Sequence, residues 1–314
     1  MRVSEEVSQT LARGGPLVAL ESTLIAHGLP WPDNLETARE AEAEVRQAGA
    51  VPATIAVIAG VPRIGLHGAE LERLALSQDV LKASRRDLAV AVARGLDAAT
   101  TVSATLSLAR RAGVRIMATG GLGGVHRGAA TTFDISNDLD ELARADGMAV
   151  VCSGAKSILD LPATLEVLET LGVPVVGYQT DTLPAFLTRS SGLGLSIRAD
   201  DPAQAADIIR AHGWLGLPGA VVIAQPVPLE SALSEAAFER ALQRALDFAT
   251  ASRTTGKELT PFLLGAIREA TGGQALIANR ALIVNNARLA GRIALEADRV
   301  QGDSSVGFLG GPKT

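Results

Sequence analysis

The sequence predicts an α/β fold, in which a mostly parallel sheet is covered by helices on both faces as an α/β/α sandwich. Short apolar runs of strand length alternate along the chain with segments whose apolar residues recur at helical spacing. Hydrophobic residues make up 47% and charged residues 20% of the 314 positions, so the chain can bury a large core. No linker-like segment divides it. We therefore expect one domain over residues 1–314, with a loose Gly-, Ser- and Pro-containing tail at 302–314.

The individual elements follow from local patterns. Apolar runs predict strands at residues 16–20, 54–59, 114–118, 148–152, 173–178 and 220–224. Asp33 is expected to cap the first helix, with Glu36 bonding back and Gly49 ending it. Helical spacing predicts further helices at residues 86–94, 102–111, 162–171, 203–211, 230–251, 260–270 and 275–297.

Composition argues against several classes of function. The net charge is −5 and aromatic residues make up only 3%, so a basic, base-stacking surface for nucleic acid is not expected. No apolar run has transmembrane length, and residues 1–15 lack the apolar region of a secretory signal. The single Cys152 fits a reducing compartment and a buried thiol. These features predict a cytoplasmic protein that binds a small molecule and neither nucleic acid nor membrane.

Lys156 follows the apolar run 148–152 after three small residues. Ligands of parallel sheets bind at the carboxyl ends of strands, so this lysine is a candidate amine nucleophile. The alternative is a solvated loop lysine. Glu21 similarly ends the first strand, where a raised pKa would suit a general acid; capping of the next turn is the competing interpretation.

Two segments could bind phosphate. Lys82, Arg85 and Arg86 are three cations close together, although such a run is also typical of a solvated helix start. The glycine-rich segment 120–124, followed by His126, could present backbone amides to an anion or form a purely structural turn.

A third segment offers oxygen ligands. Asp134 and Asp138, with the intervening Ser136 and Asn137, could hold Mg²⁺ or Mn²⁺ with several retained waters. Helix capping by Ser136 or Asn137 is the alternative.

Taken in order, these segments resemble the pseudouridine-5'-phosphate glycosidase family, which includes the indigoidine synthase A type proteins. The resemblance extends over about residues 16–297. It is carried by Glu21-Ser22-Thr23, His27-Gly28-Leu29-Pro30, Lys82-x-Ser84-Arg85-Arg86-Asp87, Thr100-Thr101-Val102, Ala118-Thr119-Gly120-Gly121-x-Gly123-Gly124-Val125-His126-Arg127, Phe133-Asp134-Ile135-Ser136-x-Asp138-Leu139, Cys152-x-Gly154-Ala155-Lys156-Ser157, Gly177-Tyr178-Gln179-Thr180-Asp181, Thr260-Pro261-Phe262 and Asn285-Asn286-Ala287.

The resemblance implies reversible cleavage of the carbon–carbon glycosidic bond of pseudouridine 5'-phosphate to uracil and ribose 5-phosphate. It implies that Lys156 forms an imine with the opened sugar, that Glu21 donates protons and that Asp134 binds manganese, with magnesium less expected. It also implies a homotrimer. The substrate-contacting positions implied are Lys82, Val102, Ser136, Asn137 and Asp138, and the motifs add Thr119, His126 and Asn285.

The chain departs from the family pattern at a few positions. Trp31 replaces the more frequent tyrosine, and Thr182 follows Asp181 where glutamate is common. Asn137 and Ser153 replace small residues. None of these changes removes a candidate catalytic group, but they leave the tolerance for the base open.

Two other functions remain open from the residues alone. Another Schiff-base enzyme, such as a sugar-phosphate aldolase, would share Lys156 without needing to recognise uracil. A non-catalytic sugar-phosphate sensor would not need Glu21, Asp134 and Lys156 together, and all three are present.

Overall fold

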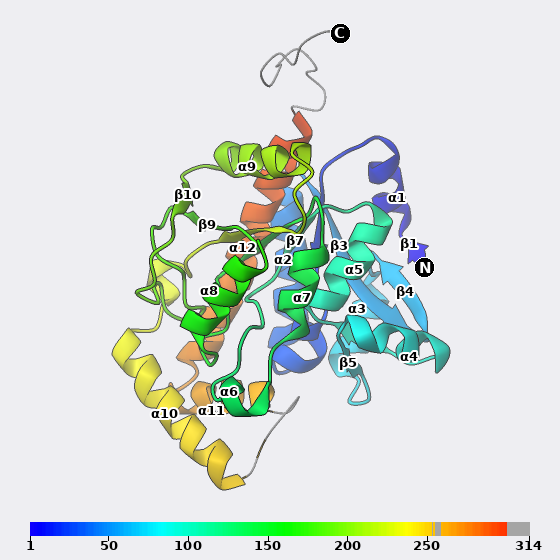
Figure 1. Cartoon of the computed structure of the whole chain (residues 1–314). Helices are drawn as coiled ribbons and strands as arrows, with labels where there is room; N and C mark the ends of the chain where they lie inside the picture. The colour runs from blue at the N-terminus through cyan, green and yellow to red at the C-terminus, as the bar shows by residue number, and fades with distance from the viewer. Residues whose placement is uncertain (253, 255–258, 300–314) are drawn as a thin grey trace.

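The computed structural model describes residues 1–252, 254 and 259–299. The predicted tail at 302–314 lies outside this range. An eleven-stranded sheet runs through the molecule (Figure 1). Its main path follows the order β1, β4, β3, β2, β7, β8, β11, β9 and β10, and β6 joins β5 to β3. The strands span Arg2–Val3 (β1), Leu17–Leu20 (β2), Val51–Ile58 (β3), Val61–Ile64 (β4), Leu81–Ala83 (β5), Ala98–Thr100 (β6), Ile116–Ala118 (β7), Ala149–Cys152 (β8), Val175–Tyr178 (β9), Ile197–Ala199 (β10) and Val221–Ala224 (β11).

Most strand pairs are parallel, which confirms the predicted fold class. The exceptions are the antiparallel pairs that β3 makes with β4 and with β6. Strands β8, β9 and β11 are buried along their whole length, as expected where helices cover both faces.

Helices form a layer on each side of the sheet (Figure 1). The long α12 contacts β2, β7 and β8 and lies beside α2 and α9, while α5, α7 and α8 cover the opposite face. The helices span Glu5–Ala12 (α1), Asp33–Gln47 (α2), Gly68–Leu76 (α3), Leu88–Ala93 (α4), Val102–Ala112 (α5), Ala129–Thr132 (α6), Asn137–Arg144 (α7), Leu161–Thr170 (α8), Pro202–Trp214 (α9), Glu235–Ser252 (α10), Leu259–Ala270 (α11) and Gln274–Arg299 (α12). Single helical turns occur at Leu24–Gly28, Arg85–Asp87 and Leu229–Ser231. Among the described residues, no helix combines the length and hydrophobicity needed to cross a membrane.

Several local predictions were wrong. Asp33 does not cap α2; Pro32 holds that position, and Asp33 in the first turn pairs with Arg280 of α12. The predicted helix at 230–251 begins only at Glu235, after the short turn at Leu229–Ser231. The sequence patterns also missed β1, β4, β5, β6 and β10, which are only two to four residues long and lack a continuous apolar run that marks a strand.

Candidate active site

The carboxyl ends of three adjacent strands bring Glu21, Thr119 and Lys156 to one edge of the sheet. Glu21 follows β2, Thr119 follows its neighbour β7, and Lys156 lies just beyond β8, which pairs with β7. The Thr119 hydroxyl donates a hydrogen bond to the Glu21 carboxylate. The parallel arrangement therefore places the predicted acid and the predicted nucleophile where α/β sheets usually bind ligands.

Glu21 is a buried carboxyl group with a perturbed pKa. It is 8% exposed, and burial raises its pKa above the ordinary value. The positive charge of Lys156, the hydrogen bond from Thr119 and, less strongly, Lys82 oppose this shift, whereas the negative charge of Asp138 adds to it. A raised pKa keeps the carboxyl protonated to higher pH, which suits a proton donor. Glu21 can do so because desolvation outweighs the nearby lysines.

A tightly fixed loop positions Lys156. Its backbone N–H donates to the carbonyl of Leu122 at 3.0 Å, and Ser157 donates its hydroxyl to the carbonyl of Ala185 at 2.7 Å. Gly154 has a φ of +77°, and a Cβ there would lie 2.0 Å from the Pro184 carbonyl oxygen. Glycine is therefore required at 154, and the half-buried Lys156 side chain starts from a fixed backbone.

The predicted substrate contacts Lys82, Val102 and Asp138 come from β5, α5 and α7. Lys82 lies in β5, and the buried Val102 opens α5. Asp138, near the start of α7, is 5% exposed and accepts backbone N–H groups from Ser103 at 3.0 Å and Gly123 at 2.9 Å. Lys82 and Asp138 both act electrostatically on Glu21, so the structure brings these predicted substrate contacts toward the predicted acid.

Ser136 and Asn137 have different surroundings. The Ser136 hydroxyl caps α7 by accepting the N–H of Asp138 at 3.2 Å, which confirms the capping alternative. Asn137 is exposed in the first turn of α7. Its predicted contact with substrate stays a prediction.

Asp134 and His126 lie side by side at the border of the site. His126 Nδ1 is 4.0 Å from Asp134 Oδ2, and the Asp134 side chain is 41% exposed. Burial lowers the pKa of His126, with Lys156 and Lys82 acting in the same direction and Asp134 opposing them. The lowered pKa favours the neutral imidazole at neutral pH.

This donor set fits a hydrated divalent ion. The described part of the chain contains no cluster of three or more His, Cys, Asp or Glu side chains that could form a protein-only metal site. One half-exposed carboxylate is compatible with an ion that keeps most of its water ligands, as Mg²⁺-like ions do.

Two neighbouring asparagines of α12, Asn285 and Asn286, have different surroundings. Asn285 lines a separate groove of about 770 Å³, together with Tyr178 and Gln225. The fully buried Asn286 instead donates to the carbonyl of Thr119 at 2.9 Å. Asn286 therefore braces the Thr119 segment, a role that the sequence motif did not distinguish from that of its neighbour.

A smaller recess of about 280 Å³ lies beside the turn that follows Glu21. His27, Phe186 and Asn279 line it, along with residues of α11. Sequence reasoning did not single out Asn279 or Phe186. The positive φ of Phe186 (58°) is a backbone property that a sequence pattern does not show.

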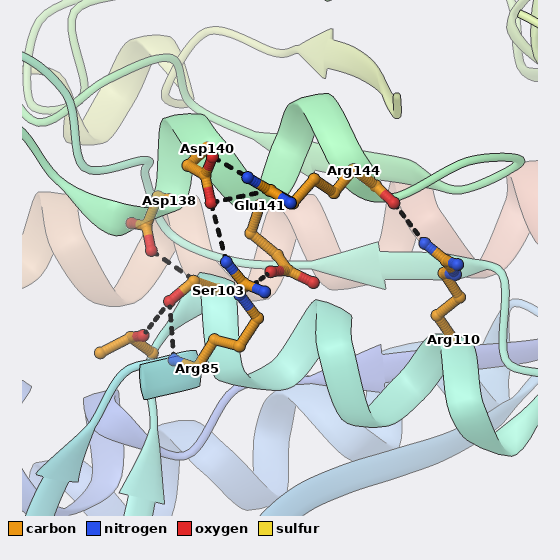
Figure 2. A network of polar contacts seen from close by, with 8 residues as sticks. Arg85, Ser103, Arg110, Asp138, Asp140, Glu141 and Arg144 are labelled. Atoms are coloured by element: carbon orange, nitrogen blue, oxygen red, sulfur yellow. Dashed lines mark hydrogen bonds and ion pairs between the residues drawn. The ribbon is translucent and has the colours of Figure 1, made fainter. Parts of the chain in front are cut away.

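Several groups of the two predicted phosphate-binding segments already have partners within the protein. Arg85 is held by Glu141 and Asp140 of α7 instead of pointing toward a free anion site (Figure 2). In the glycine segment, the N–H groups of Leu122, Gly123 and Val125 already donate to protein acceptors. A Cβ on Gly123 would lie 2.2 Å from Ser136 Oγ, so close packing is the main reason for that glycine.

Cys152 and two of the four departures from the family pattern, Trp31 and Thr182, are not part of the predicted pair of acid and nucleophile. Cys152 is buried, and burial raises the pKa of its thiol to about 12, which confirms the predicted core thiol. Trp31 is 54% exposed, and the hydroxyl of Thr182 accepts a hydrogen bond from Ser190 at 2.9 Å. Neither of these two side chains bonds to Glu21 or Lys156 in the described chain.

The sequence is closely similar to proteins of one family over nearly its whole length. The family model for indigoidine synthase A like protein matches residues 6–296. A pseudouridine-5'-phosphate glycosidase of Caldanaerobacter subterraneus is 53% identical over 95% of this chain and 97% of its own length. The protein of the same name from Paracoccus denitrificans is 54% identical over 93% of this chain and 96% of its own length.

Solved structures show the same fold. The prealnumycin C-glycosynthase AlnA, in complex with ribulose 5-phosphate, has a TM-score of 0.89 and 41% identity, and covers 96% of this chain and 98% of its own. An indigoidine synthase A like protein from Thermotoga maritima has a TM-score of 0.84 and 38% identity, and covers 91% and 94%. With nearly full-length similarity in both sequence and structure, the chain belongs to the indigoidine synthase A like family.

Proposed function

We propose that this enzyme is a pseudouridine-5'-phosphate glycosidase, which cleaves the C–C bond between ribose 5-phosphate and uracil. The observation that carries the proposal is the buried, high-pKa Glu21 beside the strand-end Lys156. The names of the full-length relatives support the substrate, and a C-glycosynthase that binds a pentose phosphate supports the type of bond.

The geometry suits a reaction that needs both an amine and an acid. A uracil carbanion is a poor leaving group compared with an alkoxide. Breaking the C1′–C5 bond therefore needs a group that donates electrons to C1′ as the bond breaks. Lys156 Nζ would attack C1′ and lose a proton, while the C1′–O4′ bond breaks and O4′ takes a proton from Glu21. The sugar is then open, with an amine at C1′.

The second stage breaks the C–C bond. The nitrogen lone pair forms a C1′=N bond, the C1′–C5 electron pair passes to the uracil carbon, and that carbon takes a proton from Glu21. Water then hydrolyses the imine to ribose 5-phosphate and free Lys156. The net reaction consumes one water. The proton that Nζ loses after its attack passes to the Glu21 carboxylate and restores the acid for the second stage, and the proton that the iminium nitrogen loses restores it again after uracil leaves.

We also infer a hydrated Mn²⁺ at Asp134, in agreement with the single half-exposed carboxylate beside a neutral His126. When bound, such an ion supplies positive charge that orders water and anionic groups. We further propose a cytoplasmic homotrimer. The lone buried thiol supports a reducing compartment, and exposed apolar side chains such as Phe133 and Phe248 support association.

The test is covalent trapping followed by turnover. The purified protein is incubated with ribose 5-phosphate and borohydride, and its peptides are mapped by mass spectrometry. A reduced pentose phosphate adduct on Lys156, together with release of uracil from pseudouridine 5'-phosphate, is expected. Cleavage of ketose phosphates without uracil release would instead identify an aldolase.

A further inference from the structure

Arg85 belongs to a network of polar contacts that joins two segments of the proposed substrate site (Figure 2). Its side chain extends from the turn Arg85–Asp87 to α7, where Nε lies 2.6 Å from Glu141 Oε2 and the terminal nitrogen lies 2.9 Å from Asp140 Oδ2. The guanidinium thus spans two carboxylates of one helix. The contact with Asp140 is a hydrogen bond and the contact with Glu141 is an ion pair, and together they restrict where the guanidinium can lie.

The contacts close into a ring. The backbone N–H of Arg85 donates to Ser103 Oγ at 3.3 Å, and the backbone N–H of Ser103 donates to Asp138 Oδ1 at 3.0 Å. Asp138 and Glu141 lie one turn apart in α7, which returns the ring to Arg85. The ring as a whole therefore connects three segments: the one after Lys82, the start of α5 and the start of α7.

Two contacts of the network, Arg85 with Glu141 and Asp140 with Arg144, differ in burial. Glu141 is 4% exposed, and Arg85 acts on it more strongly than Arg110 and Arg144 do, so the loss of Arg85 would remove the main compensation of a buried carboxylate, which is costly. The contact between Asp140 and Arg144 is exposed on both sides and contributes little. The Arg85–Glu141 contact is consequently the one that constrains the backbone.

We infer that Arg85 is a positioning residue that sets Lys82 and Asp138 at the spacing required to bind the sugar phosphate. The inference rests on the proposed function, because it concerns the same substrate. Lys156 and Glu21 come from β8 and β2, outside this ring. Loosening the ring should therefore weaken substrate binding more than it slows the chemical step.

Arg85→Gln is expected to raise KM for pseudouridine 5'-phosphate about tenfold, while kcat stays within about twofold. The dissociation constant for ribose 5-phosphate, measured by titration calorimetry, should rise in parallel. Arg85→Lys keeps a cation near Glu141 and should recover part of the loss. Arg144→Gln, which removes only the exposed contact, is the matched control and should behave as the parent enzyme.

A double substitution separates positioning from mere stability. Arg85→Gln with Glu141→Gln removes the buried charge that has lost its main partner, so the melting temperature should recover while KM stays high. Recovery of KM together with the melting temperature would overturn the proposal, as would parent-like KM in Arg85→Gln.

The proposed function and this inference fail in different ways. A parent enzyme that releases no uracil contradicts the function, and the ribose 5-phosphate titrations then decide the role of Arg85. An active parent whose affinity is the same in Arg85→Gln contradicts the inference alone.

Discussion

Thr119 donates its hydroxyl hydrogen bond to the buried carboxylate of Glu21, although 98 positions separate the two residues in the chain. The bond joins the ends of neighbouring strands β2 and β7. It also lowers the pKa of Glu21, against the larger effect of burial. The protonation of the proposed acid is thus set by opposing contributions, and each can be tested separately.

Replacing Thr119 and Asp138 should move the pKa of Glu21 in opposite directions. Thr119→Val removes a contribution that lowers this pKa, and Asp138→Asn removes a charge that raises it. If Glu21 must be protonated, the alkaline limb of kcat against pH should shift upward in the first variant and downward in the second. Thr119→Ser should restore the parent profile. Shifts in the same direction for both variants would contradict this assignment.

Glu21→Gln should lower kcat by about 10²- to 10⁴-fold, because a positioned proton donor contributes roughly that much. Although its kcat falls, the variant should be more stable than the parent enzyme at neutral pH. A carboxyl whose folded pKa is raised loses stability as pH increases from the unfolded value toward the folded value. Gln cannot ionise, so the variant should melt above the parent at pH 7 and together with it well below pH 4.5, the ordinary value. Calorimetric scans at both pH values would check this.

Lys156→Ala should abolish uracil release, since no other amine is expected to form the imine, and leave the fold intact because the side chain is only half-buried. Far-ultraviolet circular dichroism provides the control for folding. Turnover comparable to that of the parent enzyme would exclude imine catalysis at this residue.

Asp134→Ala should raise the Mn²⁺ concentration needed for half-maximal activity at least about tenfold, because it removes the one carboxylate assigned to the ion. Metal-dependent quenching of intrinsic fluorescence or direct calorimetric titration gives a readout independent of activity. Unchanged Mn²⁺ affinity would place the ion elsewhere.

Cys152 should resist alkylation in the native protein. Its thiol pKa of about 12 leaves almost no thiolate at pH 8, and the side chain is buried. Intact-mass measurement after iodoacetamide treatment should show one adduct only when denaturant is present. Rapid labelling of the native protein would mean that β8 opens readily.

The local pattern of the sequence was enough to identify six central strands of the sheet, β2, β3, β7, β8, β9 and β11, but not the short strands around them. Apolar runs that lead into Glu21, Thr119 and Lys156 report burial directly, because a strand covered on both faces excludes polar side chains. The resemblance to a family then assigned roles that spacing alone had left open, and the comparisons support that family.

The tertiary structure decided which long-range contacts form. Sequence could not show that Arg85 pairs with Glu141, that Asp33 pairs with Arg280 or that Asn286 braces Thr119. These contacts join elements far apart in the chain and depend on which face each side chain occupies after packing. The spacing of apolar residues along the chain indicates which side chains are buried. It does not indicate which residues of other helices or strands they contact, because that depends on how the layers pack.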